Sequence, residues 1–217
     1  MSKEKETEDR KLPKSSLIRP VIQFYSAKNR AAMYCDSDLE ADGLCFLEFA
    51  PSVKRYVTQP KSFGWQYQKR KLRYTPDILV EFVNGNYEFI EVKPLELTEE
   101  SEFAEKFEAL QANFSEWQER ELRLMTCREI RHQDEHLRRH QLYQFRKREP
   151  VTEEQQQLGK SVLTSHETLK IQDLVLAFES KGYTPIDAWT FLSHQYHNID
   201  FLGKPTLTIN TQIKWSH

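Results

Sequence analysis

The sequence predicts an α/β fold, a mixed sheet flanked by helices, followed by a small C-terminal domain. Two runs rich in Val, Ile, Phe and Tyr lie within residues 72–94 and flank Asn84-Gly85-Asn86, which is typical of an antiparallel hairpin. An amphipathic helix over about residues 98–121 and a short strand over residues 122–126 follow. Because a strand after a crossover helix commonly rejoins the same sheet, these elements predict a mixed sheet.

Length and composition favour an ordered protein with one medium domain and one small one. Of the 217 residues, 38% are hydrophobic and 29% charged, which leaves enough apolar surface for a core. The chain has no run of eighteen apolar residues and no apolar segment at its start, so we expect a cytoplasmic protein that is neither secreted nor membrane-spanning. Cys35, Cys45 and Cys127 lack metal-ligand spacing, so we expect reduced thiols that pack as small hydrophobic side chains.

The formal net charge of −2 conceals an uneven distribution. The stretch 54–73 contains seven basic residues and no acidic one, whereas the stretch 88–121 contains eleven acidic residues. A basic stretch of this kind is typical of a surface that binds nucleic-acid phosphates. The candidate DNA-binding residues are Lys54, Arg55, Lys61, Lys69, Arg70, Lys71 and Arg73.

The N-terminal part is predicted to be a mobile basic arm over residues 1–30, because its charges show no apolar period. Residues 36–49 are then predicted to form a helix with Ser37 as its N-cap. Glu40 follows at the third helical position, so the ordinary interpretation of this acid is a capping carboxylate.

Two strands are predicted over residues 53–59 and 63–67, before a basic turn at residues 68–71. Their aromatic residues alternate with Lys and Arg. This mixture suits a ribbon that faces phosphates, although aromatic residues in strands more often belong to the core.

The predicted hairpin carries three charged residues whose positions follow from its loop. If Asn84-Gly85-Asn86 form the loop, with positive φ at the second or third residue, the numbers of opposing residues add up to 170. Asp77 then faces Lys93, and Leu79 faces Glu91. Because side chains alternate between the faces of a strand, the three charged residues share one face. The opposite face is expected to be the core face and carries Ile78, Val80, Phe82, Ile90 and Val92.

An Asp on one strand and Glu-x-Lys on the next have two interpretations. Buried charges are costly unless they are paired or bind a metal, and two close carboxylates suit a hard divalent cation. Such a cation would polarise a phosphoryl oxygen and lower the pKa of a bound water, while Lys93 would stabilise negative charge during phosphodiester cleavage. The plainer interpretation is a cross-strand Asp77–Lys93 ion pair on an exposed face, worth roughly 0.2–1 kcal/mol. The hairpin alone leaves both open.

Glu149-Pro150-Val151 marks the predicted start of a C-terminal domain over residues 150–217. Short helices followed by a terminal hairpin make a winged-helix-like module the leading prediction, and such modules bind DNA or proteins. The sequence has no Gly-rich phosphate loop, so nucleotide hydrolysis is not expected. The helices are predicted over residues 153–160, 171–181 and 185–197, and the strands over residues 199–202 and 206–215.

A competing motif, His132-Gln133-Asp134-Glu135-His136, matches the H-x-x-E-H pattern of inverted zinc peptidases. On a helix predicted over residues 132–148, its two histidines would share a face, as zinc ligation requires. Several arginines surround them and disfavour a dication, so a solvated basic face is the preferred interpretation.

Several motifs together carry a family resemblance. Over about residues 33–148 the chain resembles the TnsA endonuclease subunit of heteromeric TnsA/TnsB cut-and-paste transposases. The resemblance implies a restriction-endonuclease-like catalytic domain over residues 31–149, followed by the C-terminal domain. Asp…Glu-x-Lys alone is shared by many nucleases, and only the combination of motifs is specific. In order, they are Ser37-Asp38-Leu39-Glu40, residues 47–53, Tyr56 with Gln59-Pro60, Tyr74-Thr75-Pro76-Asp77 and Glu91-Val92-Lys93-Pro94.

The resemblance also implies roles for the site residues. The catalytic residues correspond to Glu40, Asp77 and Lys93. The implied metal ion is Mg²⁺, with Mn²⁺ as a substitute, and its ligands would be Glu40, Asp77, Glu91 and the carbonyl of Val92. Glu91 occupies a position that is not always acidic in the family, and Glu40 would combine the roles of cap and ligand.

Partners are implied in the same way. This subunit would nick the 5′ ends of a transposon, while a TnsB-type transposase cuts and joins the 3′ ends and a TnsC-type ATPase regulates the assembly. Such a protein would act at the nucleoid in a bacterial cytoplasm. The alternative is a non-catalytic subunit that bridges transposon-end DNA and partner proteins.

Overall fold

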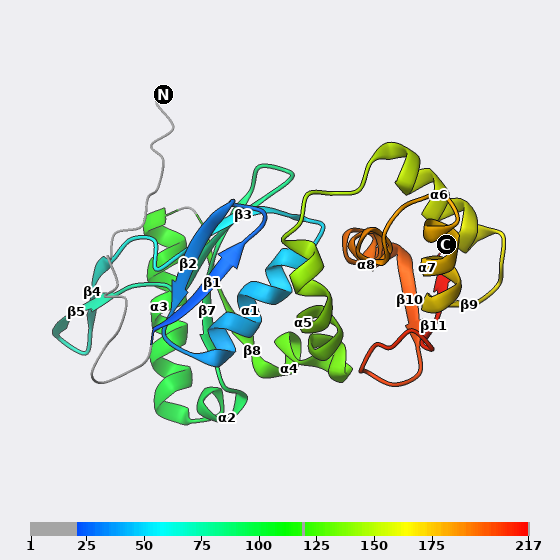
Figure 1. Cartoon of the computed structure of the whole chain (residues 1–217). Helices are drawn as coiled ribbons and strands as arrows, with labels where there is room; N and C mark the ends of the chain where they lie inside the picture. Colours follow the sequence, from blue (N-terminus) through cyan, green and yellow to red (C-terminus); the bar gives the residue numbers. More distant parts are fainter. Residues whose placement is uncertain (1–20, 119, 217) are drawn as a thin grey trace. The chain divides into compact units, whose positions relative to one another are not determined.

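The computed structural model describes residues 21–118 and 120–216 of the chain (Figure 1). Contacts between residues divide the chain into two compact units, one up to His132 and one from Gln133 onward. The first twenty residues of the predicted arm lie outside the described residues. None of the described helices is both long enough and apolar enough to cross a membrane.

The first unit is built on a four-stranded sheet of β3 (Val53–Thr58), β6 (Ile78–Phe82), β7 (Tyr87–Lys93) and β8 (Glu121–Thr126). The strand order is β3-β6-β7-β8. β6 is antiparallel to both β3 and β7, whereas β7 is parallel to β8. A parallel pair needs a crossover, which α3 (Ser101–Gln118) provides. The predicted mixed sheet is confirmed.

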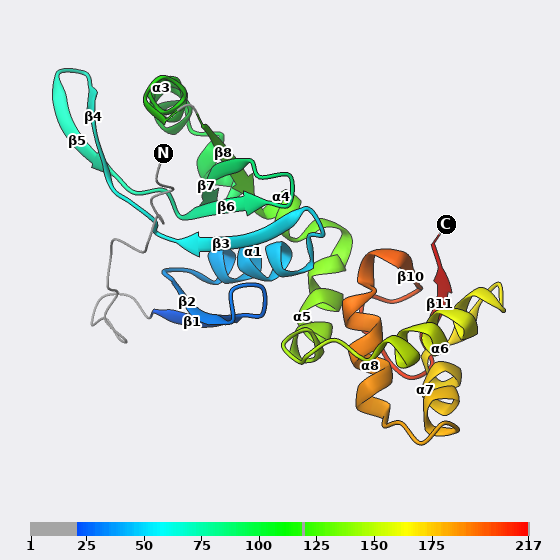
Figure 2. The same cartoon turned by 90° about the horizontal axis from the view of Figure 1, so that it is seen from above.

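Helices cover both faces of this sheet (Figure 2). α1 (Asp38–Phe49) lies on one face and starts at the predicted N-cap Ser37, whose side chain accepts a hydrogen bond from the backbone N–H of Glu40. α3 lies on the other face and is preceded by the short α2 (Leu95–Thr98). β6 and β7 therefore have two core faces where the sequence predicted one. The core beneath α3 consists of Phe63, Trp65, Leu79, Phe89, Phe107, Leu110, Phe114 and Leu122.

The hairpin of β6 and β7 forms in a different register from the predicted one. Leu79 lies opposite Phe89, so the numbers of opposing residues add up to 168. The loop is residues 83–85, closed by the backbone N–H of Phe82, which donates to the carbonyl of Asn86 at 2.9 Å. Gly85 has a φ of 87°, and a three-residue hairpin loop needs its positive φ at the third position. Because the register differs from the predicted one by two residues, each side chain stays on its predicted face of the hairpin. Asp77, however, lies level with Glu91 instead of Lys93.

Part of the predicted arm is an ordered hairpin. β1 (Ile22–Ser26) pairs antiparallel with β2 (Ala31–Cys35). The side chains of Phe24, Met33 and Cys35 are buried, so this hairpin is held by apolar contacts that two five-residue strands signal only weakly in sequence. The structure thus has paired strands from residue 22 onward, where the sequence predicted an arm over residues 1–30.

A second hairpin, β4 (Phe63–Tyr67) with β5 (Arg70–Tyr74), precedes β6 and forms its own two-stranded sheet. Its turn is Gln68-Lys69, with φ values of 45° and 65°. Positive φ at both positions is the geometry of a two-residue turn whose twist matches that of its strands.

The second unit includes α5 (Glu135–Arg146), although the predicted domain boundary lay after residue 149. α5 packs against α8 (Pro185–His194), and the rings of Phe145 and Trp189 stack with centroids 5.6 Å apart. This packing explains why the structure divides before α5. The remaining elements are α6 (Glu153–Thr164), β9 (Leu169–Lys170), α7 (Ile171–Glu179), β10 (Ile199–Leu202) and β11 (Gln212–Trp215).

Most elements predicted for this unit are present with different ends. The predicted terminal hairpin forms, but only residues 212–215 of its second strand are extended. Gly182 follows α7 with a φ of 81°, as expected of a residue just beyond a helix end. β9 pairs with β11 in a sheet of order β10-β11-β9 and was not predicted, because two residues carry no periodic signal.

Candidate active site

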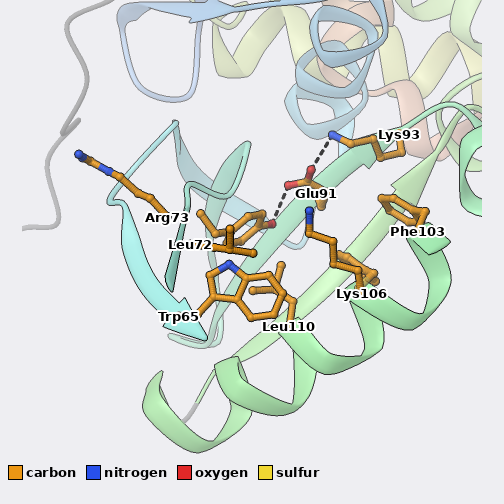
Figure 3. Close-up of a pocket in the computed structure, with 10 residues that line it drawn as sticks. Trp65, Leu72, Arg73, Glu91, Lys93, Phe103, Lys106 and Leu110 are labelled. Carbon is orange, nitrogen blue, oxygen red and sulfur yellow. Dashed lines mark hydrogen bonds and ion pairs between the residues drawn. The ribbon is translucent and has the colours of Figure 1, made fainter. Parts of the chain in front are cut away.

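Three of the predicted site residues meet at one end of the β6–β7 hairpin. Asp77 directly precedes β6, while Glu91 and Lys93 lie in the last part of β7. The Lys93 Nζ lies 2.5 Å from Glu91 Oε1 (Figure 3). It also lies 3.8 Å from Asp77 Oδ2. These charged side chains are only partly exposed to water: Asp77 is 17%, Glu91 10% and Lys93 29% exposed.

The carboxylate of Asp77 is held in an environment that disfavours its charge. Its side chain is 17% exposed, and Oδ2 accepts a hydrogen bond of 2.7 Å from the backbone N–H of Val92. Burial raises the pKa of Asp77, the charge of Glu91 raises it further, and Lys93 offsets only part of this rise. A positive charge placed near Asp77 would therefore stabilise its ionised carboxylate.

Lys93 stays cationic between these acids. Burial lowers the pKa of Lys93, but the negative charges of Asp77 and Glu91 outweigh burial and bring the pKa above its usual value. Its Nζ also donates to the carbonyl of Val92 at 3.2 Å.

Tyr74 is a site residue that the sequence reasoning did not assign. It ends β5, and its hydroxyl donates to Glu91 Oε2 at 2.6 Å. Burial and the neighbouring Glu91 raise the pKa of Tyr74, so its hydroxyl remains a donor. The resemblance drew attention to Tyr74-Thr75-Pro76-Asp77, but no spacing rule shows that a side chain from a separate two-stranded sheet reaches Glu91.

Glu40 acts as a capping carboxylate, its ordinary interpretation. Ser37 Oγ donates to Glu40 Oε1 at 2.8 Å, and the backbone N–H of Asp36 donates to Oε2 at 3.0 Å. Burial raises the pKa of Glu40, against the hydrogen bonds from Asp36 and Ser37. The charge of Glu40 in turn raises the pKa values of Asp77 and Lys93, so this acid is electrostatically part of the same cluster.

The donor set at this site fits a hard divalent cation in its chemistry. Asp77 and Glu91 supply carboxylate oxygens and Val92 a carbonyl oxygen, the ligand types that Mg²⁺ prefers. The Lys93 ammonium contacts Glu91 and the Val92 carbonyl, so it partly neutralises these oxygens. Among the described residues, no three acidic, His or Cys side chains are grouped closely enough to hold a metal as they lie.

The seven candidate DNA-binding residues fall into two places. Lys54 Nζ lies 2.7 Å from Glu81 Oε1 and Arg55 pairs with the same carboxylate, at the opposite end of β6 from Asp77. The other five are exposed, four of them on the β4–β5 hairpin: Lys61, Lys69, Arg70, Lys71 and Arg73.

The aromatic residues between these basic positions belong to the core. Tyr56, Phe63 and Trp65 are 1%, 8% and 6% exposed. The register of the β4–β5 hairpin places Lys71 and Arg73 opposite Gln66 and Gly64, on the face away from Trp65 and the core. The hairpin thus has an apolar inner face and a basic outer face.

The zinc-peptidase motif does not form a site. Between α4 (Cys127–Ile130) and α5 the chain makes a 3-10 turn at His132–Asp134, in which Gln133 has a φ of 44°. His132 thus lies outside the helix that carries His136, so the two histidines do not share a helical face. The described part of the chain contains no metal-binding group that includes them.

A mixed sheet between helices, with an acid before one strand and Glu-x-Lys at the end of the next, fits the class of restriction-endonuclease-like nucleases. Residues 50–127 match the family model of the TnsA-like endonuclease N-terminal domain. This match confirms the resemblance to the TnsA-type endonucleases and suggests a nuclease role in transposition. It spans β3 to β8 and so includes Asp77, Glu91 and Lys93, but not Glu40. No curated protein matches the chain.

Proposed function

We propose that this protein is a Mg²⁺-dependent DNA endonuclease that nicks the 5′ ends of a transposon, together with a TnsB-type transposase and a TnsC-type ATPase. The observation that carries the proposal is the Asp77–Glu91–Lys93 cluster at the end of the β6–β7 hairpin, within the matched family domain. The cluster has two acidic side chains and one basic side chain, and a divalent cation would offset the excess negative charge.

Asp77, Glu91 and the Val92 carbonyl would hold the ion, with Glu40 as a further acidic residue. When bound there, Mg²⁺ supplies Lewis-acid polarisation of a phosphoryl oxygen and a lower pKa for a bound water. The protein orients the two carboxylates by hydrogen bonds: the backbone N–H of Val92 donates to Asp77 Oδ2, and the Tyr74 hydroxyl donates to Glu91 Oε2. Lys93 stabilises the negative charge that develops on the scissile phosphate.

The proposal is tested by a nicking assay on transposon-end DNA with Mg²⁺, with and without a TnsB-type partner. We expect metal-dependent nicks at the 5′ ends. If no nick forms even with the metal and the partner present, the protein is instead the non-catalytic bridging subunit.

The exposed basic residues at the turn and on the outer face of the β4–β5 hairpin are proposed to hold DNA phosphates. We expect the Lys69→Gln, Arg70→Gln and Lys71→Gln triple variant to bind DNA more weakly. The dependence of log binding constant on log salt should flatten by about 0.9 for each lost phosphate contact. The matched control is Lys54→Gln with Arg55→Gln, because both side chains already pair with the carboxylate of Glu81. An equal change in the control, or an unchanged slope in the triple variant, would contradict this assignment.

The second unit is proposed to be a winged-helix-like module that binds protein. The order α6-β9-α7-α8-β10-β11 is typical of such modules, which place their third helix in the DNA major groove. Here that helix is α8, and α5 covers it: Ser193 Oγ donates to the Leu142 carbonyl at 3.0 Å. Gln141 of α5 also contacts the loop between β10 and β11: its side-chain amide donates to the Leu207 carbonyl at 3.3 Å and accepts from the Leu207 backbone N–H at 2.7 Å. The face of α8 that would enter the DNA groove is therefore covered by α5.

For this reason we expect Lys204→Glu, in the exposed loop between β10 and β11, to leave the affinity for transposon-end DNA unchanged. A module that read DNA with this loop would lose a phosphate contact, and its affinity would fall at low salt. Fluorescence anisotropy with labelled end DNA distinguishes the two results.

A further inference from the structure

A cavity of about 310 Å³ opens beside the candidate active site, between the β4–β5 hairpin and α3 (Figure 3). Its walls are apolar and aromatic, with Trp65 and Leu72 from the hairpin and Phe107 and Leu110 from α3. The cavity also reaches Glu91 and Lys93, so it is continuous with the site. A cavity of this size is at the lower end of the range for small-molecule sites and suits a single ring system.

A basic side chain, Lys106, also lines this cavity. Lys106 is the only basic residue in the sequence of α3, which otherwise contributes acidic residues. Its side chain is exposed, lines the cavity and points towards Glu91 (Figure 3). Arg73 also borders the cavity, but its guanidinium points away from it (Figure 3). The cavity thus combines flat apolar walls with the cation of Lys106 at its mouth, which suits a ligand with a ring and an anionic group.

We propose that this cavity receives one nucleobase, unstacked from the DNA beside the scissile phosphate, while Lys106 contacts a neighbouring phosphate. The proposal rests on the proposed nuclease function. A base next to the cleaved bond is joined to that phosphate by a single sugar, and the cavity shares Glu91 and Lys93 with the site that would hold the phosphate. Aromatic and apolar side chains bind the face of any base, so the capture requires no particular sequence. An apolar side chain of a partner protein would leave Lys106 without a role.

The test uses the full chain with Mg²⁺, end DNA and, where nicking requires it, the TnsB-type partner. Leu72→Trp should fill the cavity from its half-buried rim and slow nicking about tenfold, the loss expected for one base–aromatic stack. The same variant should regain the wild-type rate on DNA with an abasic position at one nucleotide beside the mapped nick. The matched control is Leu137→Trp at an exposed leucine of α5, which should nick normally.

A second readout does not depend on cleavage. Asp77→Asn should bind DNA that carries 2-aminopurine beside the nick, and the fluorescence should rise as the base leaves the stack. Adding Leu72→Trp should remove this rise. Lys106→Gln, at an exposed position, should flatten the salt dependence of binding by about one contact, or about 0.9 in slope.

Three results would overturn the proposal: Leu72→Trp nicks paired DNA at the wild-type rate, no abasic position restores its activity, or 2-aminopurine stays quenched at every position. Loss of activity without abasic rescue would assign the cavity to a partner side chain. Absence of nicking by the wild-type protein would instead refute the proposed function, and a fluorescence rise in that case would still support base capture.

Discussion

Asp77→Asn is expected to abolish nicking and at the same time to stabilise the metal-free protein at pH 8. The pKa of Asp77 in the folded protein is raised above the unfolded value of about 3.9 by burial and by Glu91. The folded state therefore binds the proton of Asp77 more tightly than the unfolded state does. The protonated Asp77 contributes fully to stability below about pH 4, and this contribution is lost as the pH rises through the pKa of the folded state. Asparagine keeps the acceptor for Val92 N–H without the charge.

The measurement is urea unfolding in EDTA at pH 5 and pH 8. We expect Asp77→Asn to be more stable than the wild type at pH 8 by about 1.4 kcal/mol or more, the equivalent of one pKa unit. The difference should shrink at pH 5. Asp200→Asn is the control, because Ser216 and Lys214 lower the pKa of Asp200 and the sign of the effect is reversed. An Asp77→Asn protein that nicks normally would refute the catalytic role of Asp77. One that is less stable than the wild type at pH 8 would refute the electrostatic explanation.

Lys93→Gln should have the second large effect. Nicking should fall about 10²- to 10³-fold, the loss seen when one group that stabilises transition-state charge is removed. Without metal the protein should also lose stability at pH 8, because the carboxylates of Asp77 and Glu91 then lie close together without the cation that offsets their repulsion. Breaking a buried pair costs roughly 3–5 kcal/mol, and we expect less because Lys93 is 29% exposed.

Mg²⁺ separates this explanation from a packing defect. A cation bound between the two acids would replace the lost charge, so Mg²⁺ should raise the melting temperature of Lys93→Gln more than that of the wild type. Lys54→Gln is the matched control: Glu81 keeps Arg55 as its partner, and the Lys54 side chain, at 58% exposed, is well hydrated, so we expect a loss of only about 1 kcal/mol. If Mg²⁺ shifts neither protein, the acids at this site do not hold the ion.

Local sequence was sufficient for most of the elements, though not for the β1–β2 hairpin or β9, and for which side chains share a face. Ser37 at the start of α1, the strands on either side of residues 83–85 and the terminal hairpin all follow from capping, β-propensity and period-two alternation. Alternation also placed Asp77, Glu91 and Lys93 on one face, and an even shift of register leaves that result unchanged. The grouping of these three charged side chains was therefore predictable before their exact geometry.

Tertiary structure decided how these residues meet. Whether Asp77 lies level with Lys93 or Glu91 depended on which loop closes the hairpin, and nearest-neighbour patterns do not distinguish two three-residue loops that share Gly85. The hydrogen bond from Tyr74 to Glu91, the second core face beneath α3 and the position of α5 on α8 all depend on contacts between residues distant in sequence. Such contacts form only when side chains from separate elements pack together, and no periodicity within a single element records them.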